Sequence, residues 1–175
     1  MNDPAGMNIG DDAGSEFRIA NLDDPRIVNL LATHARLALS GARCRQGHAL
    51  DVQALRDPEI EVWSLWLDDG PVAVGAIRRL SPGHGELKSM FVIDAARGKG
   101  LGRVLLERLI EVAQRRNMKR LSLETGASDY FEAARRLYAS HGFEVCAAFA
   151  DLPPHPDSVF MTLVCPVVNP VTFRV

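Results

Sequence analysis

Alternating apolar and polar positions predict strands in the middle of the chain. Two runs rich in β-branched and aromatic residues, 60–67 and 72–80, flank the turn-forming residues 68–71, Asp-Asp-Gly-Pro. An Asp-Gly step between two such runs is typical of a tight hairpin, so we expect these strands to pair antiparallel. Residues 81–85 turn the chain again into a strand at 86–92. The middle of the chain is therefore predicted to be a β-meander.

Apolar residues at helical spacing predict a helix before this meander, after a short first strand at 16–22. Its buried face comprises Ile27, Leu30, Leu31, His34 and Ala38. Asp24 and Pro25 supply an N-cap and a first helical residue. We expect this helix to lie on the sheet, with His34 as a buried histidine. Residues 41–58 lack a regular pattern and are predicted to be a loop or broken helix, either shaping a substrate pocket or serving as a solvated connector.

The second half of the chain alternates between helices and strands. A long helix follows the glycine-rich run 97–102 and is predicted to end near Asn117. It leads into a strand at 120–125, which should lie parallel to strand 86–92 because a helix crosses between them. A helix at 131–140 and two strands, 143–146 and 159–164, complete the pattern. The fold class is α+β, with a mixed, mostly antiparallel central sheet.

Length and charge narrow the class of protein. A chain of 175 residues suits one domain, which we place at residues 16–165 between a flexible N-terminal tail, 1–15, and a C-terminal tail, 166–175. A formal net charge of -2 predicts no general affinity for nucleic acid. Apolar runs stay well short of the roughly 18 uncharged residues that indicate a membrane span, so no membrane association is expected.

The cysteines and histidines show no metal-binding spacing. Cys44, Cys146 and Cys165 are widely separated, and the five histidines form no H-E-x-x-H pair. We interpret the cysteines as reduced thiols in a cytoplasmic protein and expect no metal site. Cys146 is expected to pack in the core, since no His–Asp arrangement that would make it a nucleophile is recognisable around it.

The glycine-rich run Arg97-Gly98-Lys99-Gly100-Leu101-Gly102 is the strongest chemical signal. A strand that enters such a turn and then a helix directs unpaired N–H groups and a positive helix end at one point. Arg97 adds a full charge, so the site should bind a phosphate or pyrophosphate. The spacing matches neither a P-loop nor the G-x-G-x-x-G of a dinucleotide fold. From this turn alone, a flexible segment without a ligand remains the alternative.

This region resembles the GNAT superfamily of acyltransferases. The spacing from Arg97 through Gly100 to Gly102 is similar to its pyrophosphate loop, [QR]-x-x-G-x-[GA]. Ala134, Leu137 and Tyr138, with the Gly-Phe pair at 142–143, resemble its A-x-x-L-Y-x-x-x-G-F segment, and the resemblance extends over residues 16–164. It implies a GNAT-like fold with helices on both sheet faces and the parallel strands splayed at the cofactor site.

The resemblance also implies acetyl-CoA as the donor substrate. Its pantetheine arm would lie in the opening between the strands that end at Val92 and Thr125. The expected cofactor-binding residues are Met90, Phe91, Val92, Arg97, Gly98, Lys99, Gly100, Leu101, Gly102 and Arg103. Many relatives carry Asn where this chain has Phe131, which removes one polar contact to the cofactor arm.

By the same resemblance, Tyr138 is the expected acid that protonates the departing thiolate. The ordinary pKa of a tyrosine phenol, near ~10, suits that role. A structural role for this tyrosine is the alternative. Glu86 and Glu124 are candidate bases, with solvent as a third possibility. Side chains alternate along a strand, so we expect Glu86, Lys88, Met90 and Val92 to share one face, with Glu86 toward the acceptor.

The predicted function is that of an N-acetyltransferase that moves an acetyl group directly from acetyl-CoA to a primary amine. The acceptor, a small-molecule amine or a peptide, is not identified by the sequence. A catalytically inactive acyl-CoA-binding sensor is the alternative. A phosphotransferase is disfavoured because no Ser or Thr that could bind magnesium follows the glycines. The final strand is expected to be exposed, which would permit a homodimer through sheet addition.

Overall fold

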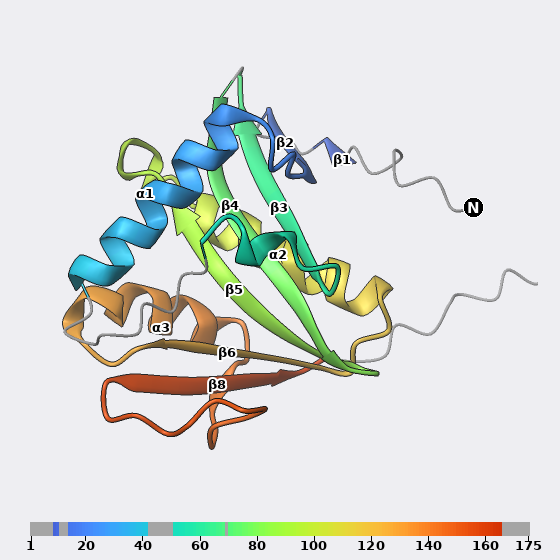
Figure 1. Cartoon of the computed structure of the whole chain (residues 1–175), viewed down its shortest axis with the longest axis vertical. Coiled ribbons are helices and arrows are strands. Elements are labelled where there is room, and N and C mark those ends of the chain that lie inside the picture. Colours follow the sequence, from blue (N-terminus) through green and yellow to red (C-terminus); the bar gives the residue numbers. More distant parts are fainter. Residues whose placement is uncertain (1–8, 11–13, 42–50, 69, 166–175) are drawn as a thin grey trace, which may run out of the picture.

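The computed structural model describes residues 9–10, 14–41, 51–68 and 70–165. The sheet order is β1-β2-β3-β4-β5-β6-β8-β7 (Figure 1). Its strands are β1 (Ile9–Gly10), β2 (Ser15–Ile19), β3 (Ile60–Leu67), β4 (Gly70–Ser81), β5 (His84–Val92), β6 (Arg120–Gly126), β7 (Glu144–Val145) and β8 (Ser158–Val164). The helices are α1 (Pro25–Gly41), α2 (Leu101–Arg115) and α3 (Glu132–Ser140), with short 3-10 turns η1 (Ala54–Arg56), η2 (Asp94–Ala96) and η3 (Asp129–Phe131).

The predicted helix after the first strand is α1, and its start is fixed by local hydrogen bonds. The Asp24 carboxylate accepts a bond of 2.9 Å from the backbone N–H of Arg26, as expected of an N-cap beside Pro25. Strand β2 ends at Ile19, earlier than predicted. The reason is a turn at Asn21, whose side chain accepts a bond of 2.9 Å from the N–H of Asp23.

The central meander forms as predicted. Strand β3 pairs antiparallel with β4, and β4 with β5. The turn between β4 and β5 needs only Pro82 and Gly83, the latter at a positive φ of 82°, so β5 begins at His84, before the predicted residue 86. Residues 42–50, half of the predicted irregular segment 41–58, lie outside the described residues, as do Asp69 and most of the predicted tails.

The one parallel pair separates along its length. Strand β5 pairs with β6 from His84 to Leu87, opposite Arg120 to Leu123, and beyond Leu87 no further pairs are formed between them. Strand β5 continues to Val92 beside β4, while β6 continues to Gly126 beside β8. The two strands therefore splay apart, as the fold prediction required, and leave a gap in the sheet that side chains from the helices line.

A β-bulge in β5 changes which side chains share a face. Val74 of β4 lies opposite Phe91, but Ala76 lies opposite Lys88, so β5 carries one extra residue, and Ser89 has a positive φ of 52°. Met90 consequently packs against the α2 side of the sheet, whereas Phe91 packs with the α1 side. The prediction that Glu86, Lys88, Met90 and Val92 share one face was wrong, because simple alternation stops at a bulge.

The last strand in sequence is not at the edge of the sheet. Strand β8 lies between β6 and the short β7, whose residues Glu144 and Val145 pair with Thr162 and Met161. The expectation of an exposed final strand was therefore wrong for β8, since the chain folds back so that β7 covers part of it. Val145, on the actual edge strand, is 75% exposed.

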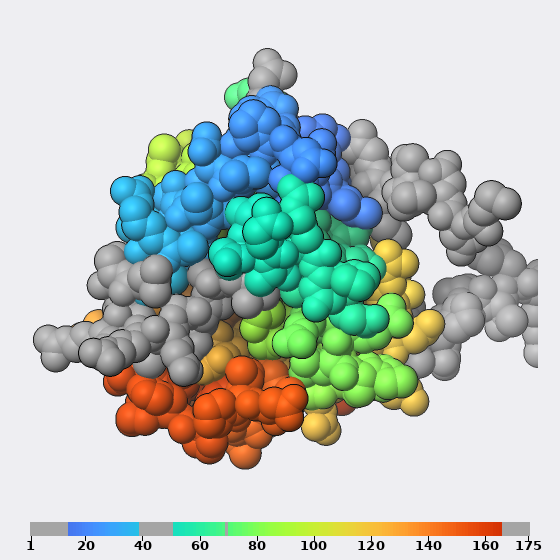
Figure 2. All heavy atoms as spheres, in the orientation of Figure 1, coloured from blue at the N-terminus to red at the C-terminus, as the bar shows by residue number. Residues whose placement is uncertain are grey.

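Helices cover both faces of the sheet and create two cores. The α1 side is centred on Ile27, Leu31 and Trp66, and the α2 and α3 side on Leu105, Leu109 and Phe143. Figure 2 shows one face of the molecule, on which α1 in blue and the η1 region in teal lie side by side; Arg56 of η1 donates a bond of 2.9 Å to the Leu22 carbonyl. Within the described residues, no helix is long and apolar enough to cross a membrane.

Candidate active site

Two adjoining cavities lie where β5 and β6 splay apart. The larger, here called the cleft, has a volume of about 440 Å³ and runs along the end of β5, the glycine-rich turn and α3. The smaller, here called the inner cavity, has a volume of about 80 Å³ and lies between α1, β5 and β6. The residues that line both are His34, Ala38, Met90, Phe131, Ala134 and Tyr138. These shared residues form the junction between the two cavities.

The glycine-rich turn forms one end of the cleft. Gly98 and Gly100 adopt positive φ angles of 75° and 78°, which glycine reaches without strain. A Cβ added at either position would have no protein atom within 4 Å, so the backbone faces open space. Helix α2 begins at Leu101, where the first N–H groups have no partner within the helix. The turn therefore has the shape and polarity of an anion site.

Nine of the ten predicted cofactor-binding residues line the cleft; Lys99 does not. The two arginines among them, Arg97 and Arg103, are largely exposed, with 48% and 70% of their side chains accessible. Arg97 pairs with Asp94 at 3.0 Å and Arg103 with Glu107 at 2.8 Å. Exposed pairs of this kind are weak, so both guanidiniums can turn toward an anion at the glycine-rich turn.

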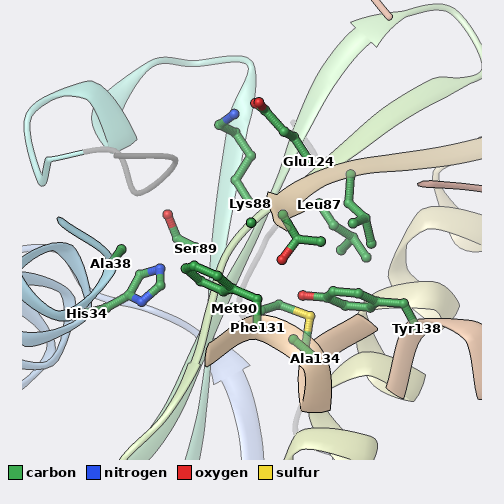
Figure 3. Close-up of a pocket in the computed structure, with 13 residues that line it drawn as sticks. His34, Ala38, Leu87, Lys88, Ser89, Met90, Glu124, Phe131, Ala134 and Tyr138 are labelled. Carbon is green, nitrogen blue, oxygen red and sulfur yellow. The ribbon is translucent and has the colours of Figure 1, made fainter. Parts of the chain in front are cut away.

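Tyr138 stands at the junction of the cleft and the inner cavity. Its ring packs against Phe143, with centroids 5.8 Å apart, and its hydroxyl has no hydrogen-bond partner among the described residues. Figure 3 shows this hydroxyl pointing toward the middle of the residues that line the inner cavity. Burial raises the pKa of the phenol to about 12, above the ordinary value that the sequence suggested. The phenol therefore remains a hydrogen-bond donor at neutral pH.

His34 projects from α1 to the same junction. Its ring stacks on Phe91 of β5, with centroids 5.2 Å apart and planes 27° apart. Burial lowers the pKa of the imidazole to about 4, because the charged form loses its hydration there. The side chain is half-buried and not, as predicted, fully buried on α1, and its ring is neutral at pH 7.

Phe131, where many relatives of the resembled family carry Asn, forms an apolar part of the junction. A Cβ added at Gly126 would lie 2.2 Å from the Phe131 ring, so this ring lies directly against the end of β6. Tyr130 meets it edge-on, with centroids 4.9 Å apart. Where those relatives carry a polar Asn side chain, Phe131 thus contributes an aromatic wall to both cavities.

The two candidate bases occupy different environments. The carboxylate of Glu86 is 2% exposed and accepts a bond of 2.7 Å from the Lys88 ammonium. Glu86 lines neither cavity, whereas Glu124 lines the inner cavity and accepts a bond of 2.7 Å from the Ser158 hydroxyl. In Figure 3 the side chains of Lys88 and Glu124 extend to the same side of this cavity. The splay of the strands thus places Glu124, not Glu86, on the cavity wall.

Cys146 lies away from both cavities. It is half-buried, and burial raises the pKa of its thiol, opposed in part by Arg120. A raised pKa disfavours the thiolate that nucleophilic catalysis needs. Cys146 and Cys165 are free thiols, and Cys44 lies outside the described residues. Within the described part of the chain, no cluster of three or more ligand-type side chains could hold a metal ion.

Several lining residues were not predicted from the sequence. They include His34 and Ala38 from α1, and Tyr130, Ala133, Ala134 and Leu137 from the region of α3. A signal existed for Ala134, which lies four residues before Tyr138 and therefore on the same helix face. Leu137 belongs to the same A-x-x-L-Y segment. No comparable signal existed for α1, since its packing over the end of β5 is set by the tertiary fold.

Comparisons with known proteins identify the family. Residues 29–143 match the model of the acetyltransferase (GNAT) family. An uncharacterized N-acetyltransferase of Bacillus subtilis, YsnE, is 41% identical over 146 residues, which cover 83% of this chain and 97% of the relative.

Solved structures share the fold. An acetyltransferase from Streptococcus agalactiae superposes with a TM-score of 0.71 at 19% identity, covering 87% of this chain and 99% of that one. YncA of Salmonella typhimurium, whose structure contains its cofactor acetyl-CoA, superposes with a TM-score of 0.65 at 22% identity, covering 87% of this chain and 95% of that one.

Proposed function

Because this chain belongs to the acetyltransferase (GNAT) family of acyltransferases, we propose that it transfers an acetyl group directly from acetyl-CoA to the primary amine of a small-molecule or peptide acceptor. The observation that carries this proposal is the meeting of the cleft and the inner cavity at Tyr138. A cleft for the donor and a separate cavity for the acceptor, joined at one hydroxyl, provide the arrangement that direct transfer needs.

The chain's residues fit acetyl-CoA in the cleft. The open space above Gly98 and Gly100 can admit a pyrophosphate, with the first N–H groups of α2 as donors and Arg97 and Arg103 as counter-charges. Met90, Phe91 and Val92 form the wall along which the pantetheine arm would lie. The β-bulge at Ser89, next to these residues, interrupts the regular pairing of β4 with β5. Lys99 would stay outside the cleft and act only through its charge.

Glu124 is the better placed of the two candidate bases. An amine is an ammonium at neutral pH and must lose a proton before it can attack. Glu124 lines the inner cavity and would take that proton, while Glu86 is held by Lys88 and lines neither cavity. Water remains the alternative acceptor of the proton.

When bound, acetyl-CoA supplies a thioester whose carbon–sulfur bond breaks as the bond to the amine nitrogen forms, releasing coenzyme A. The Tyr138 hydroxyl, at the junction of the two cavities, would donate a hydrogen bond to the departing sulfur. With a phenol pKa of about 12 and a thiol pKa near ~8.5, complete proton transfer is uphill. We therefore assign Tyr138 the stabilisation of the leaving thiolate through a hydrogen bond. The proton that converts the thiolate to the free thiol then comes from the amine nitrogen that has been acetylated.

A test is the release of free thiol from acetyl-CoA in the presence of a panel of amines, with the acetylated product identified by mass spectrometry. We expect thiol release that depends on one class of amine and yields one N-acetyl product. Binding of acetyl-CoA without thiol release for any amine would contradict the transferase and favour the acyl-CoA sensor.

A further inference from the structure

Helix α3 carries Tyr138 to the junction but buries little of itself. It spans nine residues, Glu132–Ser140, all of which the structure describes, and Tyr138 is the one buried residue among them. A helix this short has little stability by itself and depends on tertiary contacts. Its position beside the gap between β5 and β6 must therefore be set by bonds to its neighbours.

Arg135 joins α3 to the end of β6. Its Nη1 donates to the Gly126 carbonyl, 2.6 Å away, and to the Ser128 carbonyl, 2.9 Å away. A terminal guanidinium nitrogen carries two hydrogens, so each carbonyl receives its own, and a charged donor makes stronger bonds than a neutral one. Gly126 ends β6 and Ser128 directly precedes η3. One side chain thus binds both the end of the strand and the start of the segment that leads into α3.

Two aromatic rings at the junction are close to Arg135 in the chain. Phe131 lies four residues before it, and the Phe131 ring packs against Gly126, the residue whose carbonyl Arg135 binds. Tyr138 lies three residues after it, about one helical turn away. Figure 3 shows both rings among the residues that line the inner cavity. A shift of α3 along β6 would therefore displace both rings.

The β6 side of this contact is next to the candidate base. Glu124 and Thr125 line the inner cavity and directly precede Gly126 on β6. The bonds from Arg135 therefore connect the helix that carries Tyr138 to the strand that carries Glu124. Transfer needs such groups at a fixed spacing, and a displacement of about 1 Å can cost on the order of 10²-fold in rate.

Building on the proposed acetyl transfer, we propose that Arg135 is a positioning residue for Tyr138, because it holds α3 at the end of β6 and so fixes the phenol hydroxyl relative to Glu124. Arg135 lines neither cavity, so it acts through the geometry of the two elements and not by contact with a substrate. The glycine-rich turn and the end of β5 lie outside this contact. Arg135 should therefore affect the chemical step more than the affinity for acetyl-CoA.

Arg135→Met and Arg136→Met give a matched comparison. Each removes one charge from α3, but the Arg136 side chain is 74% exposed and pairs with Glu132 within the helix. We expect the single-turnover rate at saturating acetyl-CoA to fall at least about tenfold in Arg135→Met and less than about twofold in Arg136→Met. Calorimetry should give wild-type affinity for acetyl-CoA in both. Equal rates in the two variants would overturn the proposal.

Arg135→Lys tests whether the donated bonds matter. An ammonium has three donors and can still bind two carbonyls, so this variant should recover most of the rate that Arg135→Met loses, and it remains measurable if Arg135→Met does not fold. A rate for Arg135→Lys as low as that of Arg135→Met, in a folded protein, would contradict a role for these bonds.

A double-mutant cycle separates positioning from a general weakening of the fold. If Arg135 acts through the Tyr138 hydroxyl, Arg135→Met should slow Tyr138→Phe by less than about twofold, because the hydroxyl that it positions is already absent. A further loss of about tenfold in that background would show that the two residues act independently and would overturn the proposal.

Fluorine NMR follows Tyr138 without any turnover. The chain has two tyrosines, Tyr130 and Tyr138, so fluorotyrosine labelling gives one resonance for each, which Tyr138→Phe assigns. We expect the Tyr138 resonance to shift or broaden in Arg135→Met, to return in Arg135→Lys and to stay in place in Arg136→Met. A displaced resonance in a protein that transfers no acetyl group would support the contact while contradicting the transferase. An unchanged Tyr138 resonance in Arg135→Met would contradict the positioning role, whether or not any amine is acetylated.

Discussion

The Lys88 ammonium lies 2.7 Å from the Glu86 carboxylate, and both side chains are almost fully buried, with 11% and 2% exposed. The pair lies on β5 just before the bulge at Ser89, on the strand that borders the inner cavity. Because little water reaches either buried group, each charge is stabilised mainly by its oppositely charged partner. The pair therefore holds Lys88 in place on the cavity wall and keeps Glu86 from it.

Removal of one partner of this pair should strongly destabilise the fold. Lys88→Met leaves the Glu86 carboxylate buried without its ammonium, and we expect the free energy of unfolding to fall by about 3 kcal/mol or more in urea titrations. Arg79→Met is the matched control, because Arg79 and Glu59 form a pair of 3.6 Å in which both side chains are more than half exposed. A change below about 1 kcal/mol is expected there, and equal losses in the two variants would contradict the buried-pair argument.

The glycine-rich turn should fail as a binding site once a side chain occupies it. Gly100→Val places a branched group in the open space of the cleft, and we expect acetyl-CoA binding to be abolished in calorimetry while the fold persists. Gly83→Val is the control for backbone strain, since Gly83 has a φ of 82° against 78° for Gly100 but lies in the β4–β5 turn. Retained acetyl-CoA affinity in Gly100→Val would show that the phosphates lie elsewhere.

Protonation of His34 should lower stability in mild acid. Its pKa is about 4 in the folded protein against an ordinary value of 6.5 for a solvated imidazole. The unfolded chain thus binds the proton more readily, and stability is lost as pH falls from 6.5 toward 4. We expect a loss of about 2 kcal/mol between pH 7.5 and 4.5 from this residue. Urea unfolding of His34→Phe, which keeps a ring against Phe91, should show a smaller loss; an identical pH dependence would exclude His34 as its source.

Much of the donor side of the site could be predicted from the sequence because it depends on local geometry. A strand, a glycine-rich turn and a helix are contiguous in the chain, so Arg97, Gly98 and Gly100 had to lie together. Tyr138 was predicted as a site residue from the local pattern of α3, and it lines both cavities. Lys99 was the exception, because a side chain in a tight turn can point to either side, and only the folded loop shows that it does not line the cleft.

The acceptor side depends on tertiary structure and was harder to predict. Simple alternation along β5 favoured Glu86 as the base, but the bulge at Ser89 has no clear sequence signal, and the splay places Glu124 on the cavity wall. His34 reaches the junction only because α1 crosses the end of β5. The position of β8 inside the sheet likewise follows from the return of the chain after β7, which a linear pattern does not encode.

Acyl transfer at the junction of the two cavities is tested most directly by the single-turnover rate of Tyr138→Phe, measured with saturating acetyl-CoA and the best acceptor. The substitution keeps the ring against Phe143, so stability and acetyl-CoA affinity should hold. Loss of the hydroxyl should slow the chemical step by about 10²-fold or more, the scale expected when a donor to developing charge is removed. A wild-type single-turnover rate, with binding and stability intact, would reduce Tyr138 to a packing residue and contradict transfer beside its hydroxyl.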